Sequence, residues 1–237
     1  MQKLWKSQRL WEGGNGMANQ EHLDILKQGV EIWNQWRQEQ QDVIPDLSRT
    51  DLRRARLVIA DLSHADLSGI KLGGVNLSYV NLSGATLSSA GLSQATLSYA
   101  DLSGATLSSA DLNGASLILA HLHNADLSEA NLSGADLRGA DLRFAKVNRA
   151  KLSSADLRFA KLYGTRLISA DLSEAKLNGA KLTGADLSEA RLDGAELDGA
   201  KLNYAYLKGA LGITLEELEK KAKSLQDATM PDGSKHS

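Results

Sequence analysis

The sequence lacks cysteine, and its net charge is close to zero. With no cysteine among its 237 residues, the chain forms no disulfide, holds no thiolate-bound metal and has no cysteine nucleophile. The formal net charge of −2 provides no overall attraction to nucleic acid or to an anionic membrane surface. Thiol chemistry is therefore excluded, and the total charge points to no class of partner.

Long hydrophobic runs are also missing. The first residues, MQKLWKSQRLWEGG, have neither the apolar run nor the small-residue cleavage pattern of a secretory signal. No segment approaches the roughly 18 consecutive apolar residues of a membrane helix. Hydrophobic residues still make up 42% of the chain, which is enough for one sizeable core. We therefore expect a soluble cytoplasmic protein with no membrane partner.

The dominant feature of the sequence is a five-residue repeat. Leucine occupies 32 of the 33 positions spaced by five from Leu47 to Leu207, with Val147 as the exception. Alanine occupies 27 of the 33 positions that lie two residues before them. A period of five matches neither the 3.6 residues of a helical turn nor the two of a strand.

Each pentad is expected to be a short extended segment followed by a corner. Two apolar residues separated by one polar residue point the same way when the backbone is extended. The two remaining residues, commonly Ser-Gly or Ser-Ser, have turn chemistry. One pentad cannot bury its leucine, whereas stacked rings can, with leucine and alanine along the axis and hydrogen bonds between rings.

The tandem phrases resemble the pentapeptide-repeat proteins. Ala65–Gly69 reads ADLSG and Ala135–Gly139 reads ADLRG, and the resemblance covers residues 45–210. It implies an all-β fold, a right-handed quadrilateral parallel β-helix with four pentads in each coil. About eight coils, at the ~4.8 Å spacing of paired strands, would form a rod roughly 38 Å long.

The flanking segments are expected to cover the two ends of this rod. Apolar positions on one stripe predict an N-terminal capping helix within residues 20–44, and its GVEIWNQWR segment resembles the cap of cyanobacterial family members. A capping box, TLEE at 214–217, predicts a C-terminal capping helix within 211–237 that ends near Lys223, before a loose tail. Residues 1–19 are expected to be a flexible leader.

Residues twenty apart should stack on one wall, so columns of the surface follow from the sequence. One column collects outward apolar residues beside two stacked arginines, a composition typical of protein-binding patches. The alternative is that aromatic side chains at corners merely cover neighbouring backbone. The predicted protein-binding patch consists of Val58, Ile59, Tyr79, Tyr99, Ile118, Leu119, Arg138, Arg158 and Phe159.

Two groups of basic residues have weaker interpretations. A column of lysines is expected to be a solvated wall offset by nearby aspartates, and its members are Lys161, Lys181 and Lys201. Four arginines lie within residues 49–56, where they are a weak indication of an acidic partner.

The sequence predicts no catalytic, cofactor-binding or metal site. His121 and His123 both point outward, but nothing forces a third ligand toward them. The repeated aspartates lie on flat walls, whereas catalysis needs a concave pocket that excludes water. We therefore expect no enzyme activity, no cofactor and no small-molecule substrate.

Two function classes remain open. The best-known activity in the family is DNA mimicry against a type II topoisomerase, which depends on a field of negative charge. Residues 45–210 contain 18 acidic and 18 basic residues, and only residues 73–136, which lack lysine and arginine, form a faint acidic belt.

The overall layout is similar to that of a cyanobacterial family member that regulates heterocyst differentiation. This resemblance implies a non-enzymatic scaffold that binds regulatory proteins of differentiation signalling and counters an inhibitory signal in a filamentous cyanobacterium. It implies no direct binding of nucleic acid. Topoisomerase mimicry is the alternative.

Overall fold

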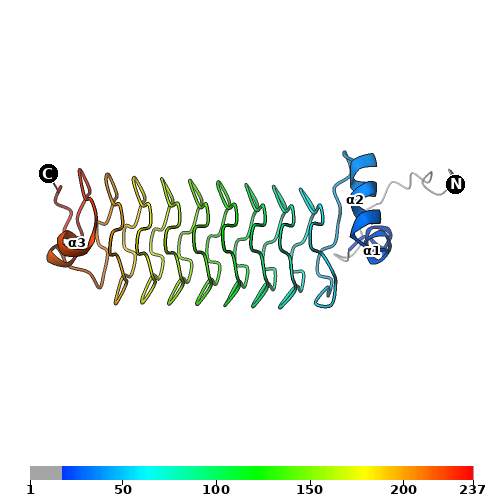
Figure 1. Cartoon of the computed structure of the whole chain (residues 1–237), viewed down its shortest axis with the longest axis horizontal. Helices are drawn as coiled ribbons and strands as arrows, with labels where there is room; N and C mark the ends of the chain where they lie inside the picture. The colour runs from blue at the N-terminus through cyan, green and yellow to red at the C-terminus, as the bar shows by residue number, and fades with distance from the viewer. Residues whose placement is uncertain (1–17, 237) are drawn as a thin grey trace.

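The protein is a rod of stacked coils with helices at both ends, as Figure 1 shows. This computed structural model describes residues 18–236. Helices α1 (Gln20–Lys27) and α2 (Val30–Glu39) lie at the N-terminal end of the rod, and α3 (Leu215–Lys221) lies at the C-terminal end. Between them the backbone pairs through isolated parallel β-bridges.

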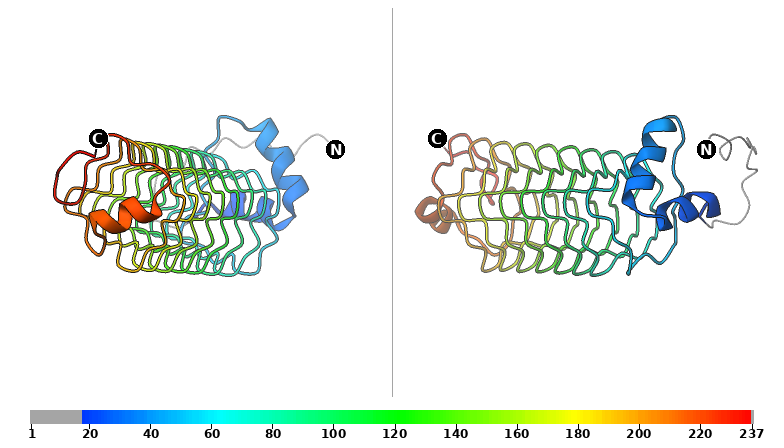
Figure 2. Two further views of the ribbon diagram at one scale, coloured as in Figure 1. Left: turned by 60° about the vertical axis from the view of Figure 1, so that its left-hand side comes forward. Right: turned by 45° about the vertical axis from the view of Figure 1, so that its right-hand side comes forward.

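The bridges join residues that are twenty apart, so four pentads make one coil. Asp61 pairs with Asn81, and Asn81 pairs in turn with Asp101. The backbone N–H of Leu62 donates to the carbonyl of Asn81 at 2.7 Å, and the N–H of Asn81 donates back to Ala60 at 3.0 Å. The two views in Figure 2 show these coils stacked around a common axis, as the repeat predicts.

We name the four walls A, B, C and D. Each wall is a column of pentads that continues at intervals of twenty residues, and the first pentads of the four columns have Leu47, Leu52, Leu57 and Leu62 at their third positions. In each pentad the first residue is usually alanine, the second forms the bridge, the third is usually leucine, and the fourth and fifth form the corner.

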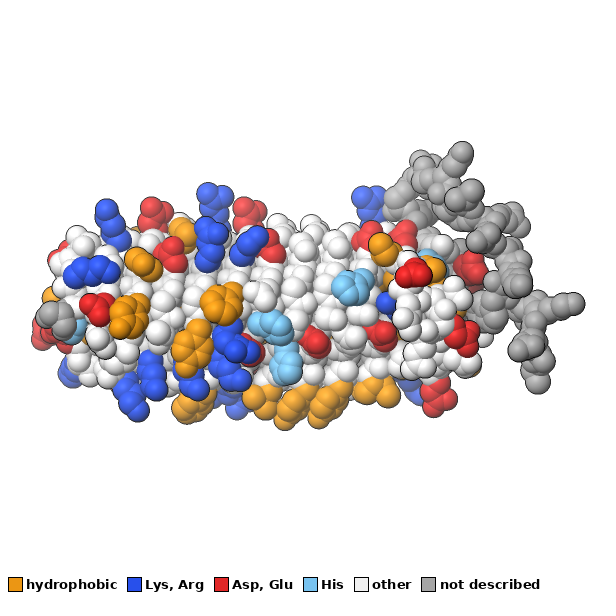
Figure 3. All heavy atoms as spheres, turned by 90° about the horizontal axis from the view of Figure 1, so that it is seen from above, with side chains coloured by type: hydrophobic (Ala, Val, Ile, Leu, Met, Phe, Trp, Pro, Cys, Tyr) orange, Lys and Arg blue, Asp and Glu red, His pale blue; other side chains and the backbone are white. Residues whose placement is uncertain are grey.

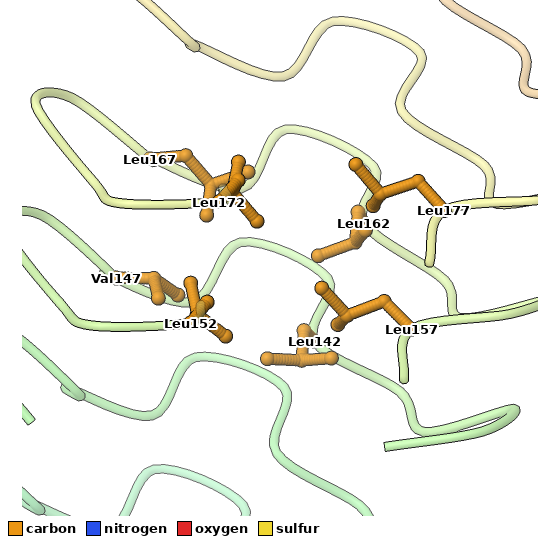
Figure 4. A pocket seen from close by; sticks show the side chains of 8 residues that line it. All are labelled: Leu142, Val147, Leu152, Leu157, Leu162, Leu167, Leu172 and Leu177. Atoms are coloured by element: carbon orange, nitrogen blue, oxygen red, sulfur yellow. The ribbon is translucent and has the colours of Figure 1, made fainter. Parts of the chain in front are cut away.

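The axis of the rod is filled by the first and third residues of the pentads. Figure 4 shows eight of these side chains, from Leu142 to Leu177, pointing into the interior, where they leave no space for a water molecule. Thr165 is a fully buried polar residue in this core, and its Oγ1 donates to the carbonyl of Leu142 at 2.8 Å. The interior is therefore packed and has no channel there.

The N-terminal cap consists of two helices, whereas the sequence analysis predicts one. Gly29 separates them with a φ of 117°, a conformation that glycine adopts without steric cost. The predicted leader extends to residue 19, but Asn19 is already the N-cap of α1 and its backbone N–H donates to Asp46. Residues 1–17 lie outside the described part of the chain.

Side chains of α2 take the place of a missing coil on wall D. The indole Nε1–H of Trp33 donates to the carbonyl of Asp61 at 2.7 Å, and Asn34 Oδ1 accepts from the N–H of Asp61 at 2.8 Å. Arg37 donates to the carbonyl of Ser63 at 3.0 Å. These groups satisfy backbone atoms that would otherwise form a bare edge.

The C-terminal end differs from the predicted loose tail. The capping box at Thr214 and Glu217 is confirmed and opens α3, which ends at Lys221. The ladder then resumes, since Leu202 donates to Ser224 and Leu207 donates to Thr229, both at 2.8 Å. The offset rises from 20 to 23 residues because α3 is inserted, while Leu225, Ala228 and Met230 continue the buried pattern.

Candidate protein-interaction site

The corner of wall C carries a line of exposed apolar side chains. We call it the wall C ridge, and its members occupy the fifth positions of the first four coils and of the sixth, where each residue is between 44% and 67% exposed. They are Ile59, Tyr79, Tyr99, Leu119 and Phe159. A row of hydrophobic side chains of this kind follows the lower edge of the molecule in Figure 3.

The backbone at the ridge favours glycine, yet bulky residues occupy it. Ile59 has a φ of 61°, Tyr99 of 60° and Phe159 of 61°, all in the left-handed region. This conformation costs an L-residue about 1–2 kcal/mol, and a β-branched side chain such as that of Ile59 tolerates it least. The same conformation recurs at corners of the other walls, for example at His64, Gln94 and Ser109, so the ridge differs in the size and apolarity of its side chains and not in its backbone.

Ridge members in adjacent coils lie one above the other along the rod. The rings of Tyr79 and Tyr99 are stacked, with centroids 5.0 Å apart and an angle of 5° between planes. Gly139 interrupts the column, but Leu119 leans over it, since a Cβ at Gly139 would lie 2.8 Å from Leu119 Cδ2. Each of the first four coils therefore presents an exposed apolar side chain at this corner, and Leu119 extends over the gap at Gly139.

The alternative interpretation is that the ridge residues only cover the backbone of the next coil. Phe159 lies over Gly179 of the following coil, where an added Cβ would come within 2.7 Å of its ring. The ring still exposes 67% of its surface, so covering the glycine uses only part of it. Val58 is exposed and Ile118 is half-buried beside the ridge, and they widen the apolar area.

The two arginines of the predicted patch are paired within their own pentads. Arg138 donates to both carboxylate oxygens of Asp136 at 2.8 and 2.7 Å. Arg158 donates in the same way to Asp156, and this pairing lowers the pKa of the Asp156 carboxyl. The charges of both guanidinium groups are thus locally compensated by the aspartates of their own pentads.

A second group of exposed aromatic residues lies on wall D, and the sequence analysis missed it. Phe144 and Tyr204 occupy fifth positions with positive φ, and both are at least half exposed. Phe144 leans over Gly164, as Phe159 leans over Gly179. Sixty residues separate the two aromatics, which is three coils, so they form no continuous surface. The same column analysis would have found them.

The aspartates of the walls have a structural task. Asp66 Oδ1 accepts a hydrogen bond from the backbone N–H of Ser68 at 2.9 Å, and Asp186 accepts from Ser188 at 3.0 Å in the same way. A second-position carboxylate therefore stabilises the corner that follows it, as short polar side chains do in turns. This accounts for the recurrence of aspartate without catalysis.

The lysine column and the two histidines lie on wall D. Lys161 approaches the buried carboxylate of Asp141, which is also paired with Arg143, and its Nζ lies 3.9 Å from Asp141 Oδ2. His123 Nδ1 lies 3.0 Å from Ser103 Oγ. Across the described residues, no group of three His, Cys, Asp or Glu side chains is arranged to hold a metal ion. Residues 18–236 also contain no helix that is long and apolar enough to cross a membrane.

Comparisons with known proteins agree with this architecture. The family described as pentapeptide repeats matches in eight overlapping copies that span residues 46–211. HetL from the cyanobacterium Nostoc sp. strain PCC 7120, a pentapeptide repeat protein involved in heterocyst differentiation regulation, is 36% identical. That match covers 80% of this chain and 89% of HetL, with a TM-score of 0.47.

Two further solved structures extend the comparison. A trypsin-treated form of QnrB1, a plasmid-mediated fluoroquinolone resistance protein, is 19% identical over 74% of this chain and 87% of its own, with a TM-score of 0.52. This likeness concerns the fold alone. The protein alr5209 from Nostoc PCC 7120 is 32% identical over 52% of this chain and 84% of its own, with a TM-score of 0.33. The curated proteins contain no match to the chain.

Proposed function

Because this chain belongs to the pentapeptide-repeat family, we propose that it is a non-enzymatic scaffold that binds a regulatory protein through the wall C ridge. Members of the family form right-handed quadrilateral β-helices, and this chain shares that fold. Such a rod holds side chains at fixed intervals of about 4.8 Å, so it can present an extended, rigid binding surface.

The observation that carries the proposal is the exposed apolar side chain that each of the first four coils places at the same corner, from Ile59 to Leu119. Tyrosine and other large apolar residues in one exposed line are the usual anchors of protein interfaces, because they bury much area and lose little side-chain entropy. The stacked Tyr79 and Tyr99 rings form its centre. Holding Ile59 at a φ of 61° is not needed for the fold, since glycine fits that position better.

We further propose that the partner belongs to a differentiation pathway of a filamentous cyanobacterium. Support comes from the sequence layout, namely the GVEIWNQWR cap and the uninterrupted leucine pentads, and from the 36% identity to HetL. In this role the protein counters an inhibitory signal by contacting regulatory proteins.

Site-specific crosslinking tests the proposed surface. A photoreactive phenylalanine analogue replaces Tyr99 on wall C or, as a matched control, Phe144 on wall D, and crosslinked proteins are identified after irradiation of living cells. Both positions are exposed corner aromatics with positive φ, so the fold tolerates them equally. A specific partner captured from Tyr99 and not from Phe144 is expected, and equal capture from both would contradict the assignment.

The alternative, a DNA-mimic inhibitor or protector of a type II topoisomerase, has weaker support. Residues 45–210 have equal numbers of acidic and basic side chains, and the acidic belt at 73–136 includes only scattered carboxylates such as Asp101 and Asp111. A mimic of DNA needs a dense negative field. An assay of gyrase supercoiling with the purified protein distinguishes the two functions, and the scaffold predicts no inhibition.

A further inference from the structure

The first coil is covered unevenly at its N-terminal edge. In a regular coil, the second residue of each pentad uses both its N–H and its carbonyl to pair with the coil before it, and the fourth residue uses its carbonyl. On wall D these groups are satisfied by Trp33, Asn34 and Arg37. On wall A, the N–H of Asp46 donates to His22 Nδ1 at 3.0 Å, and its carbonyl accepts from Asn19 at 3.1 Å.

Walls B and C lack this cover at the same positions, although Asn34 Nδ2 donates to the carbonyl of Ile59 at the corner of wall C at 3.0 Å. Within residues 18–236, the N–H and carbonyl of Asp51 and of Arg56 have no backbone or side-chain partner on the N-terminal side, and the carbonyls of Arg53 and Val58 have none either. These groups form the open edge, by which we mean the backbone from Asp51 to Val58. An unpaired edge of this kind is a template for another strand.

The open edge is also loosened and partly apolar. The bridge series passes from Asp51–Lys71 to Asp61–Asn81, and among the described residues no bridge pairs Arg56 with Asn76. Leu52 and Ala55, whose equivalents in later coils are buried, are partly exposed here. Figure 1 shows the first coil departing from the regular outline of the coils that follow. An additional strand would cover these two side chains and complete the coil.

The charge of the open edge defines what fits it. Arg53, Arg54 and Arg56 are all exposed there, and Asp51, Arg53 and Arg54 line an open notch. Only Arg53 has an acidic partner among the described residues, since it is paired with Asp51. The other two guanidinium groups can therefore bind carboxylates of an incoming chain.

We propose that the open edge binds an extended acidic segment of a partner protein, which adds a strand to walls B and C of the first coil. Main-chain hydrogen bonds would provide affinity, and the arginines would select acidic residues, as in other cases of β-strand addition. Two copies of this chain would bring their arginine clusters together, so charge repulsion disfavours a second copy as the occupant.

A designed peptide tests the proposal on the full chain. The probe is a short acetylated peptide of alternating Glu and Val. Its binding is measured by calorimetry and by the ¹⁵N amide shifts of Asp51 and Arg56. One control peptide has Lys in place of Glu, and a second keeps Glu but has alternate amides N-methylated, which removes the donors that strand pairing needs. We expect that only the acidic peptide binds, that neither control peptide does, and that the shifts are centred on the open edge.

Matched variants separate edge binding from general charge attraction. The double variant Arg54→Glu and Arg56→Glu should lower the affinity for the acidic peptide by about tenfold or more. The double variant Lys181→Glu and Lys201→Glu on wall D makes the same change in net charge and should leave that affinity within about twofold. Equal loss in both variants, or tight binding of the N-methylated peptide, would overturn strand addition.

Two further outcomes would assign the edge to another occupant. Dimerisation of the full chain that is abolished by adding the acidic peptide would show that a second copy pairs at the edge. Peptide binding that occurs only after removal of residues 1–17 would show that this segment of the chain covers the edge itself. Either result would overturn the proposal of a partner.

Discussion

Ile59 shows at the scale of one residue how function and stability compete in this fold. Its side chain is 61% exposed, so it buries little, while its φ of 61° strains a β-branched residue. Ile59→Asn should therefore raise the free energy of unfolding by about 1 kcal/mol, because asparagine tolerates the left-handed region. Chemical denaturation measures the change, and a loss of stability would show that Ile59 supports packing instead.

His22 gives the N-terminal cap a dependence on pH. Burial lowers the pKa of its imidazole below the ordinary value of 6.5, and Nδ1 accepts from the backbone of Asp46 in the neutral form. The unfolded state binds the proton first, so the stability that His22 provides is present above pH 6.5 and is lost as pH falls toward the lower folded value.

A pair of variants tests this dependence. The melting temperature of the protein should fall between pH 7.5 and pH 5.0, and His22→Gln should reduce the size of that fall. His64→Gln is the control, since His64 lies at an exposed corner. The account is wrong if both variants keep the full pH dependence of the parent protein.

At the scale of an element, some corner side chains pack over the corner of the next coil. A Cβ at Gly179 would meet the ring of Phe159 at 2.7 Å, whereas a Cβ at Gly184 would meet nothing within 4 Å, and both glycines have φ near +68°. Gly179→Ala should therefore cost about 1 kcal/mol more than Gly184→Ala, because only the first displaces an overlying ring. Equal unfolding free energies would show that Phe159 rotates away freely.

The N-terminal cap depends on hydrogen bonds from side chains to the edge of the first coil. Trp33→Phe removes the donor to the carbonyl of Asp61, which should cost about 1–3 kcal/mol beyond the loss of packing. Trp36→Phe is a matched control, because Trp36 is also buried but no hydrogen bond of its indole is found in the described structure. Similar unfolding free energies in the two variants would contradict this assignment.

The elements show which parts of the fold are readable from the sequence. The coils are predictable because the five-residue phase never breaks from Leu47 to Leu207, so each leucine in that phase has one possible place. The final partial coil is not recognised, although Leu225 and Met230 keep the spacing of five, because the insertion of α3 shifts the phase by three residues. The break at Gly29 is hidden because apolar residues continue on both sides of it.

The site is partly predictable for the same reason. Stacking of columns places Tyr79 beside Tyr99 without a structure, and the 5.0 Å ring separation agrees with it. The ion pair between Arg138 and Asp136, which neutralises the charge of the arginine, is also readable from the sequence, because residues two apart in an extended segment share a face. The uneven cover of the first coil depends on the direction of the α2 side chains, which no pattern in the sequence specifies.

For the whole molecule, the account requires that one face of the rod carries the interaction. The most direct measurement compares Tyr99→Ala with Leu119→Ser on wall C against Phe144→Ala with Tyr204→Ser on wall D, using quantitative co-purification of the partner captured at Tyr99. Both double variants remove exposed corner residues and should keep the melting temperature nearly unchanged. The account predicts that the amount of co-purified partner falls by about tenfold or more for the wall C variant and is unchanged for the wall D variant, since interface anchors typically contribute about 2 kcal/mol or more. Retention of the partner by a folded wall C variant would contradict it.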